Sequence, residues 1–230
     1  MIKKLLVFSA LAGFSFADVY ATFEAKGVKE AALNLSASGV VERINVDVGS
    51  NVKKGETLLG LNDREERAAL AAAQSDYAFL AAQFDRYQKS AEVFDKNTLD
   101  RLKSELDRAK NTLSLNKERV SKMNLSAPFS GVIAEKNVEI GDMATPTQKG
   151  LFRLISNDVK LVLSFDSKYS SQVKVGDEFC YAVDGKKSGK CVKIKKIYPA
   201  LNVENKKLNA EAEGGGLKAG TFGDGQIKTK

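Results

Sequence analysis

A short β-unit occurs twice in this chain, with about sixty residues between its two copies. The first copy lies in ASGVVERINVDVGSNVKKGETLLGLND and the second in SGVIAEKNVEIGD. Gly39 and Gly49 recur as Gly131 and Gly141, with valine or isoleucine at matching positions between them. One copy is too small to bury its own apolar face, but two copies packed together can do so. The sequence therefore predicts one β-domain built from two separated halves.

The residues between the two copies have the periodicity of helices. Apolar side chains follow one another at alternating spacings of three and four, which is the pattern of a coiled-coil seam. The first seam comprises Leu70, Ala73, Tyr77, Leu80, Phe84, Tyr87, Ala91 and Phe94. After a polar DKNT stretch, the second comprises Leu99, Leu102, Leu106, Ala109, Leu113, Asn116, Val120 and Met123. We therefore expect an antiparallel helical hairpin over residues 63–123, with Asp63 as the N-cap of its first helix.

The remaining faces of both helices are rich in charge, as in DREER and DRLKSELDRAK. A helix with one apolar stripe and charge elsewhere does not sit inside a globular core. The hairpin is therefore expected to project into solvent or against a partner. The alternative is an arm that only stiffens the molecule.

The last third of the chain has short stretches of strand-like alternation separated by turns. This spacing predicts a small antiparallel β-barrel over residues 158–230. Two cysteines, Cys180 and Cys191, flank a DG turn signal. A two-residue loop at Gly185-Lys186 would place them opposite each other and permit a cross-strand disulfide. A longer loop would shift the register and leave two reduced thiols.

The N-terminus resembles a secretory signal. Lys3 and Lys4 precede an apolar run, and Ser15-Phe16-Ala17 offers small residues at the two positions that direct cleavage. We expect residues 1–17 to be removed, which leaves a protein in a periplasmic or extracellular compartment. An uncleaved inner-membrane anchor is the alternative, although the run is shorter than the roughly twenty residues that span a bilayer.

The composition argues against an enzyme. The chain has no histidine, which removes the commonest general base and the commonest metal ligand. The patterns of phosphate loops, dinucleotide sites and serine hydrolases are also missing. Without Lys3 and Lys4 the formal net charge falls from +7 to +5, and this mildly basic charge is too widely spread to predict nucleic-acid binding. We therefore expect no catalytic residue, cofactor, metal site or nucleic-acid partner.

Both halves of the β-domain resemble the half-motifs of lipoyl/biotinyl-like domains. The matching residues of the first half are Gly39-Val40-Val41, Val46, Val48, Gly49, Val52, Lys54-Gly55 and Leu58. Those of the second half are Ala127-Pro128-Phe129-Ser130-Gly131-Val132-Ile133. The expected structural glycines are then Gly39, Gly49, Gly55, Gly131 and Gly141. With its hairpin and barrel, the chain is similar to the periplasmic adaptors of tripartite efflux pumps, also called membrane fusion proteins (HlyD/RND type).

This resemblance implies a mixed β + α fold. A split lipoyl/biotinyl-like β-domain, residues 30–62 and 124–157, carries an inserted antiparallel coiled-coil hairpin and is followed by the small antiparallel β-barrel. Residues 18–29 are then a reduced membrane-proximal or barrel region. The implied function is a periplasmic link between an inner-membrane transporter, preferably of the RND class, and an outer-membrane TolC-like channel. Self-association into a trimeric or hexameric ring and export of drugs or other toxic compounds are also implied.

In this family the tip of the hairpin contacts the channel. Arg86 fits the arginine of the family's tip pattern, whereas Ser90 and Asn97 stand where leucine and serine are usual. The expected channel contacts are Arg86, Lys89, Ser90, Val93, Phe94 and Asn97. For Phe94 the alternative is that it only closes the end of the coiled coil.

Three other functions fit parts of the pattern. An adaptor of an ABC-type exporter would share this layout, and an envelope scaffold without a role in transport would need only the coiled coil. A biotinyl or lipoyl carrier would display a modifiable lysine on a tight turn, but the helical arm occupies that position here.

Overall fold

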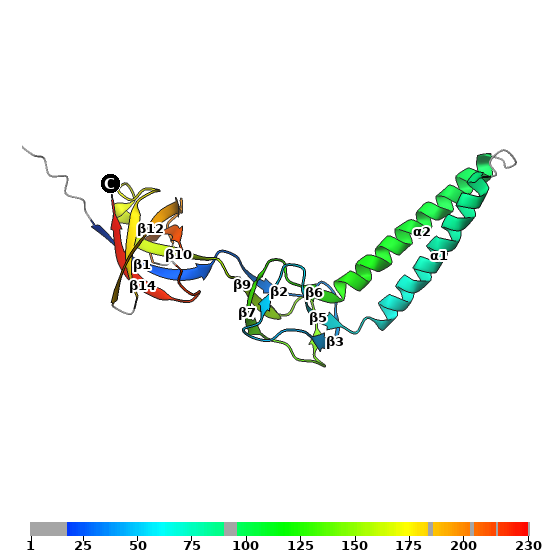
Figure 1. Ribbon diagram of the computed structural model, residues 1–230, viewed down its shortest axis with the longest axis horizontal. Coiled ribbons are helices and arrows are strands. Elements are labelled where there is room, and N and C mark those ends of the chain that lie inside the picture. The colour runs from blue at the N-terminus through cyan, green and yellow to red at the C-terminus, as the bar shows by residue number, and fades with distance from the viewer. Residues whose placement is uncertain (1–17, 90–95, 184–185, 203–204, 215, 230) are drawn as a thin grey trace, which may run out of the picture. The chain divides into compact units, whose positions relative to one another are not determined.

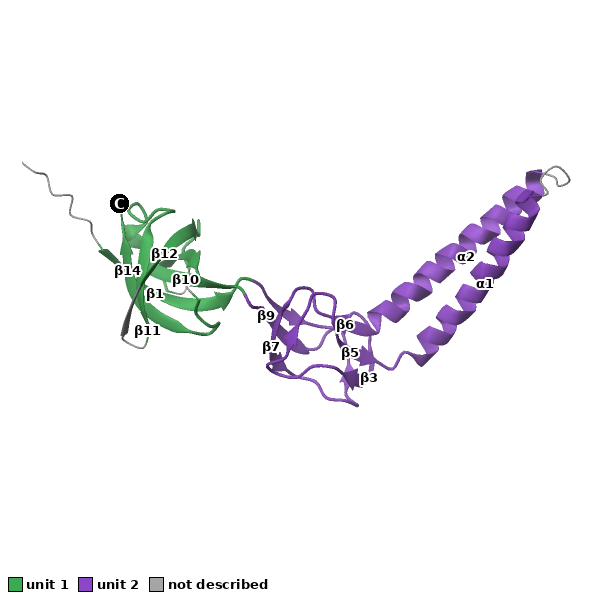
Figure 2. Cartoon of the chain, in the orientation of Figure 1, with its two compact units in different colours: residues 1–28, 158–230 green, residues 29–157 purple. Residues whose placement is uncertain are grey.

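The computed structural model describes residues 18–89, 96–183, 186–202, 205–214 and 216–229. The chain divides into two compact units (Figure 1, Figure 2). One contains the chain up to Val28 together with Asp158–Lys230, and the other is Lys29–Asn157. The predicted signal at residues 1–17 lies outside the described residues.

In the first unit, six described strands close into an antiparallel barrel with the order β1-β10-β13-β12-β11-β14. They are β1 (Asp18–Gly27), β10 (Val159–Asp166), β11 (Glu178–Val183), β12 (Lys186–Ile197), β13 (Lys207–Glu213) and β14 (Phe222–Lys228). A short 3-10 helix, η1 (Ser167–Tyr169), follows β10. Inward-facing side chains from all six strands form one core, in which Phe23, Leu161, Phe179 and Ile227 are buried.

Strand β1 extends the barrel beyond residues 158–230. Residues 18–29, which the sequence leaves open as a reduced membrane-proximal or barrel region, contain a full barrel strand. β1 pairs with β10 on one side and with β14 on the other, and so closes the barrel. Its inward-facing residues are Val19, Ala21, Phe23 and Ala25. Both partner strands lie far along the chain, so local alternation could not show where this strand belongs.

The β11–β12 hairpin also differs from its predicted form. Val183 pairs with Lys186, and residues 184–185 between them lie outside the described residues. This pairing differs from the register predicted from a loop at Gly185-Lys186, in which Val183 would lie opposite position 188. A shift in register farther along the hairpin brings Cys180 opposite Cys191, and the two are joined in a disulfide.

In the second unit, the described strands form two four-stranded sheets, ordered β2-β9-β7-β4 and β6-β5-β3-β8. The first half of the domain supplies β2 (Glu30–Leu33), β3 (Gly39–Ile44), β4 (Asn51–Val52) and β5 (Thr57–Leu61). The second half supplies β6 (Asn124–Ser126), β7 (Gly131–Lys136), β8 (Met143–Ala144) and β9 (Phe152–Ser156). Each sheet takes two strands from each half, so the halves can bury their apolar faces only together.

The two copies of the sequence repeat pair their strands with each other. Gly39 begins β3 and Gly131 begins β7, and β4 and β8 occupy matching places in the two copies. β3 pairs with β8, and β7 pairs with β4, so the long strand of each copy pairs with the short strand of the other. The shared core includes Leu61, Ile133 and Phe152. The predicted split domain is confirmed, and so is the mixed β + α fold.

Between β5 and β6 the chain forms two long antiparallel helices (Figure 1). They are α1 (Arg64–Lys89) and α2 (Lys96–Lys122). The predicted hairpin is therefore present in the interval between the two copies of the repeat.

Candidate functional site

The two predicted seams hold the helical arm together. In α1, Ala73 is buried and the other described seam residues are half-buried. In α2, Leu102 and Asn116 are buried and the rest of the seam is half-buried. The seam is polar at Asn116, whose Nδ2 donates a hydrogen bond to the backbone oxygen of Thr112 at 2.9 Å. This hydrogen bond stays within α2 and gives the buried amide a partner.

The root of the arm is anchored by hydrogen bonds between its two ends. The backbone nitrogen of Leu61, before α1, donates to the backbone oxygen of Met123, after α2, at 2.8 Å. Arg43 on β3 donates from Nη2 to Oδ1 of Asn124 on β6 at 2.6 Å. Gly60 leaves room for this guanidinium, since a Cβ there would approach it to 2.5 Å. The arm thus stands where a tight turn would otherwise join two paired strands.

Asp63 immediately precedes α1, at the predicted N-cap position. Its Oδ1 accepts a hydrogen bond from Nε of Arg67 at 2.7 Å. The side chain is 5% exposed, and Oδ2 is buried with no hydrogen-bond partner among the described residues. The hydrogen bond from Arg67, assisted by the charges of Arg67 and Arg43, outweighs desolvation and lowers the pKa of the Asp63 carboxyl. A carboxylate at this end of α1 is also favoured by the helix dipole.

We predict that Asp63 makes the stability of the arm sensitive to acid. Its pKa is lower in the folded than in the unfolded protein, so its contribution is complete above the ordinary value of about 4. That contribution is lost as the pH falls through the folded value. Asp63→Asn removes the charge that pairs with Arg67, so it should cost about 1 kcal/mol at pH 7 and flatten the loss of stability below about pH 4.

Urea unfolding of the Asp63→Asn variant at several pH values measures this effect. Asp76→Asn, at an exposed position of the same helix, is the matched control and should keep the pH dependence of the parent protein. An acid limb equally steep in Asp63→Asn and in the parent protein would contradict the assignment.

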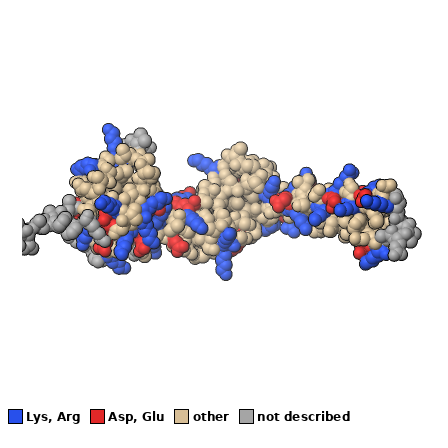
Figure 3. Space-filling view, turned by 90° about the horizontal axis from the view of Figure 1, so that it is seen from above, with Lys and Arg blue, Asp and Glu red and all other residues tan. Residues whose placement is uncertain are grey.

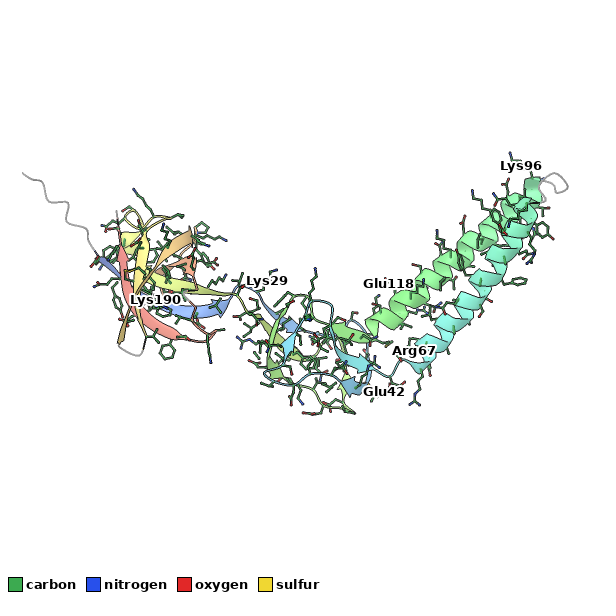
Figure 4. All side chains as sticks on the ribbon, in the orientation of Figure 1. Lys29, Glu42, Arg67, Lys96, Glu118 and Lys190 are labelled. Atoms are coloured by element: carbon green, nitrogen blue, oxygen red, sulfur yellow. A yellow bond between two sulfur atoms is a disulfide. The ribbon has the colours of Figure 1, made fainter. Side chains whose placement is uncertain are left out.

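The structure brings three of the predicted channel contacts to the free end of the arm. Arg86 and Lys89 are exposed in the last turn of α1, and Asn97 is exposed in the first turn of α2. Lys89 Nζ lies 2.7 Å from Oδ2 of Asp85. Lys96 marks this end in Figure 4, whereas Arg67 and Glu118 lie toward the root. The other predicted contacts lie outside the described residues: Ser90, Val93 and Phe94.

One flank of the arm carries a groove that the sequence pattern does not reveal. The groove has a volume of about 440 Å³ and lies between Phe79 and Leu80 of α1 and Arg108 and Thr112 of α2. Phe79 is 64% exposed, and Leu115, one turn along from Thr112, is 53% exposed. We call this surface the groove flank. Phe79 and Leu115 are large apolar residues outside the seams, and in the sequence they could have indicated this surface. The heptad pattern alone assigns such positions to solvent.

Basic and acidic side chains are interspersed along the face of the arm that Figure 3 shows.

The predicted structural glycines differ in why glycine is needed, either for a positive φ angle or for a close approach to neighbouring atoms. Gly49 and Gly141, which are equivalent in the repeat, have φ angles of 86° and 96°, in the left-handed region that favours glycine. Gly55 has a φ angle of 84°. Gly131 faces the backbone of a neighbouring strand, whereas Gly39 faces a side chain. These glycines therefore shape the split β-domain that carries the arm.

No described helix is both long and apolar enough to cross a bilayer. No three side chains of the metal-binding types gather into a metal site within the described part of the chain.

Sequence relatives share this arrangement. Residues 29–155 match the family model described as CzcB-like, barrel-sandwich hybrid domain. An uncharacterized protein of Haemophilus influenzae is 25% identical over 196 residues, which cover 79% of this chain and 48% of that protein. The cobalt-zinc-cadmium resistance protein CzcB of Cupriavidus metallidurans is 28% identical over 161 residues, or 61% of this chain and 30% of that protein. The chain thus matches less than half the length of these relatives.

Solved structures show the same fold. A MacA-MexA chimeric protein with the α-hairpin domain of Pseudomonas aeruginosa MexA has a TM-score of 0.81 at 17% identity, over 94% of this chain and 82% of that chain. The membrane fusion protein Spr0693 of Streptococcus pneumoniae has a TM-score of 0.72 at 18% identity, over 92% and 99% of the two chains. The resemblance to membrane fusion proteins, predicted from the sequence, is confirmed. Since the family model matches more than half of its residues, the chain belongs to the CzcB-like barrel-sandwich hybrid family.

Proposed function

We propose that this protein is a non-enzymatic periplasmic adaptor that links an inner-membrane efflux transporter to an outer-membrane TolC-like channel. The observation that carries the proposal is the two-helix arm, mounted between the paired strands β5 and β6 of a split sandwich domain. Membership of the CzcB-like family supports it. CzcB itself is named for resistance to cobalt, zinc and cadmium, which supports toxic compounds as the exported cargo. The proposed transporter is of the RND class.

The proposed mechanism is mechanical. Helix α1 has 26 residues, and a helix of that length spans roughly 40 Å at 1.5 Å per residue. The arm reaches the channel with its free end, near Arg86 and Asn97, while the barrel engages the transporter. The seams keep the arm stiff, and the hydrogen bonds at its root fix it to the sandwich domain.

Self-association into a ring is part of this proposal, with the groove flank as a contact surface. Exposed apolar side chains beside a groove commonly mark an interface. Phe79→Glu places a charge on this surface and should weaken self-association at least tenfold, since about 1.4 kcal/mol of lost contact suffices. Gln74→Glu, at another exposed position of α1, is the matched control. Sedimentation velocity over a concentration series measures the effect, and an unchanged profile for Phe79→Glu would exclude the groove flank.

The adaptor function is tested by capture and by transport together. Tagged protein purified from crosslinked membranes should retain one inner-membrane transporter and one outer-membrane channel. Cells that lack the protein should accumulate the exported compound. Recovery of self-copies alone, with unchanged accumulation, would favour a scaffold without a role in transport.

A further inference from the structure

The Cys180–Cys191 disulfide lies on the outer face of the barrel. Phe179, Tyr181 and Val192, beside the cysteines in sequence, are buried in the barrel core. Cys191 is exposed and Cys180 is half-buried. The bond therefore takes no part in the apolar core, and the barrel can remain packed when the bond is open.

A groove of about 480 Å³ runs beside the disulfide. A row of neighbouring residues crosses this face, because Tyr20 pairs with Gln226, Gln226 with Cys180, and Cys180 with Cys191. The charged residues lining the groove are Lys190, Lys228 and Asp224. A small thiol can reach the exposed sulfur through this groove, and nearby lysines favour the thiolate that an exchange reaction releases.

The disulfide also lies next to a shift in the pairing register of the β11–β12 hairpin. Toward the loop, Ala182 pairs with Lys187, whereas farther along Cys180 pairs with Cys191. Between these two pairs β11 has one residue, but β12 has residues 188–190. The register of the pairs at Ala182 and Val183 and the register of the Cys180–Cys191 pair therefore differ by two residues, and an irregularity in β12 absorbs the difference.

We propose that Cys180–Cys191 is a thiol–disulfide exchange site, open to dithiol reductants in the folded protein, and that the bond holds the shifted register of β11 and β12. The reductant's thiolate attacks Sγ of Cys191, the S–S bond breaks, and Sγ of Cys180 leaves as a thiolate that takes up a proton. The reductant's second thiol then attacks the mixed disulfide and releases Cys191. The reductant becomes a disulfide, and the protein gains two electrons and two protons.

Once the bond is open, no covalent link holds the shifted register, and the pairing of β11 with residues 191–193 of β12 can open locally. A slide of the whole strand by two residues would set Lys190 opposite Phe179, where Val192 now lies, and would break the pairing of Ile194 with Ala212 on β13. Reduction therefore loosens the hairpin beside the disulfide, while β12 stays paired with β13.

The first test measures whether the folded protein exchanges. Oxidised protein is treated with dithiothreitol, alkylated at intervals and counted by mass spectrometry. Exchange in the folded state predicts a rate linear in thiol and within about tenfold of the rate for urea-unfolded protein. Reduction that requires unfolding would instead be slower by about 10³-fold or more. With glutathione as the probe, the mixed disulfide should form on Cys191. Reduction limited by unfolding, or a mixed disulfide on Cys180, would overturn the site.

The second test measures the register. Reduction should speed amide hydrogen exchange at least tenfold in β11 and in residues 190–194, with β1 and β10 unchanged. Cys180→Ser with Cys191→Ser should reproduce this pattern without reductant. The matched control lacks residues 188 and 189, so that both registers coincide, and its exchange should not respond to reduction. Equal protection before and after reduction, or loss of protection throughout the barrel, would refute the proposal. Both tests use purified protein, so their outcome is independent of the adaptor function.

Discussion

Gly131→Ala is expected to destabilise the protein by about 3 kcal/mol or more, whereas Gly39→Ala should cost about 1 kcal/mol or less. The two glycines are equivalent in the repeat but differ in what surrounds them. A Cβ on Gly131 would lie 2.2 Å from the backbone oxygen of Ile155, within the β7–β9 ladder. A Cβ on Gly39 would meet Cδ1 of Leu61 at 3.1 Å, and a side-chain methyl can give way.

Urea unfolding of the two alanine variants, followed by circular dichroism, compares the two positions directly. The pair serves as its own control, because each substitution adds one methyl group at the start of equivalent strands. Equal losses of stability would show that the close approach of β9 to Gly131 does not constrain the domain.

Replacement of Asn62–Lys122 by a two-residue Asn-Gly turn is expected to abolish efflux activity while the barrel and the split β-domain stay folded. The ends of the arm already lie side by side, because the backbone of Leu61 bonds to that of Met123 and Gly60 pairs with Asn124. Two antiparallel strands in this arrangement can be closed by a tight turn. The apolar cores of the barrel and the sandwich domain lose little, since the arm buries mainly its own seams.

Accumulation of an exported compound in cells measures the activity of this armless variant, and thermal unfolding of the purified variant checks its fold. Gln74→Glu, which changes one exposed residue of the arm, should keep full activity. Normal export by the armless variant would show that the arm only stiffens the molecule.

The arm and the split β-domain that carries it could be predicted because their sequence patterns are periodic and local. The seams from Leu70 to Met123 repeat at helical spacing, and the glycines at 39 and 131 mark two copies of one unit. The place of β1 could not be predicted, since its alternation gives a strand but not its partners. The groove flank was missed because Phe79 and Leu115 fall outside the seams, where the pattern alone cannot distinguish an interface from a solvated face.

The barrel hairpin shows a second limit. Placing Cys180 opposite Cys191 by an even ladder requires a loop at Gly185-Lys186, but Val183 pairs with Lys186. The extra residues in β12 restore the pairing of the cysteines. Sequence spacing counts residues between two positions, and it does not show where a strand bulges.

The central proposal, that the free end of the arm docks on an outer-membrane channel, is tested most directly by photocrosslinking in living cells. A photoreactive amino acid is placed at Arg86, at Asn97 or, as the control, at exposed Glu118 toward the root (Figure 4). An adaptor predicts crosslinks to an outer-membrane channel from Arg86 and Asn97 but not from Glu118. Crosslinks from Arg86 and Asn97 only to other copies of this protein would contradict the proposal.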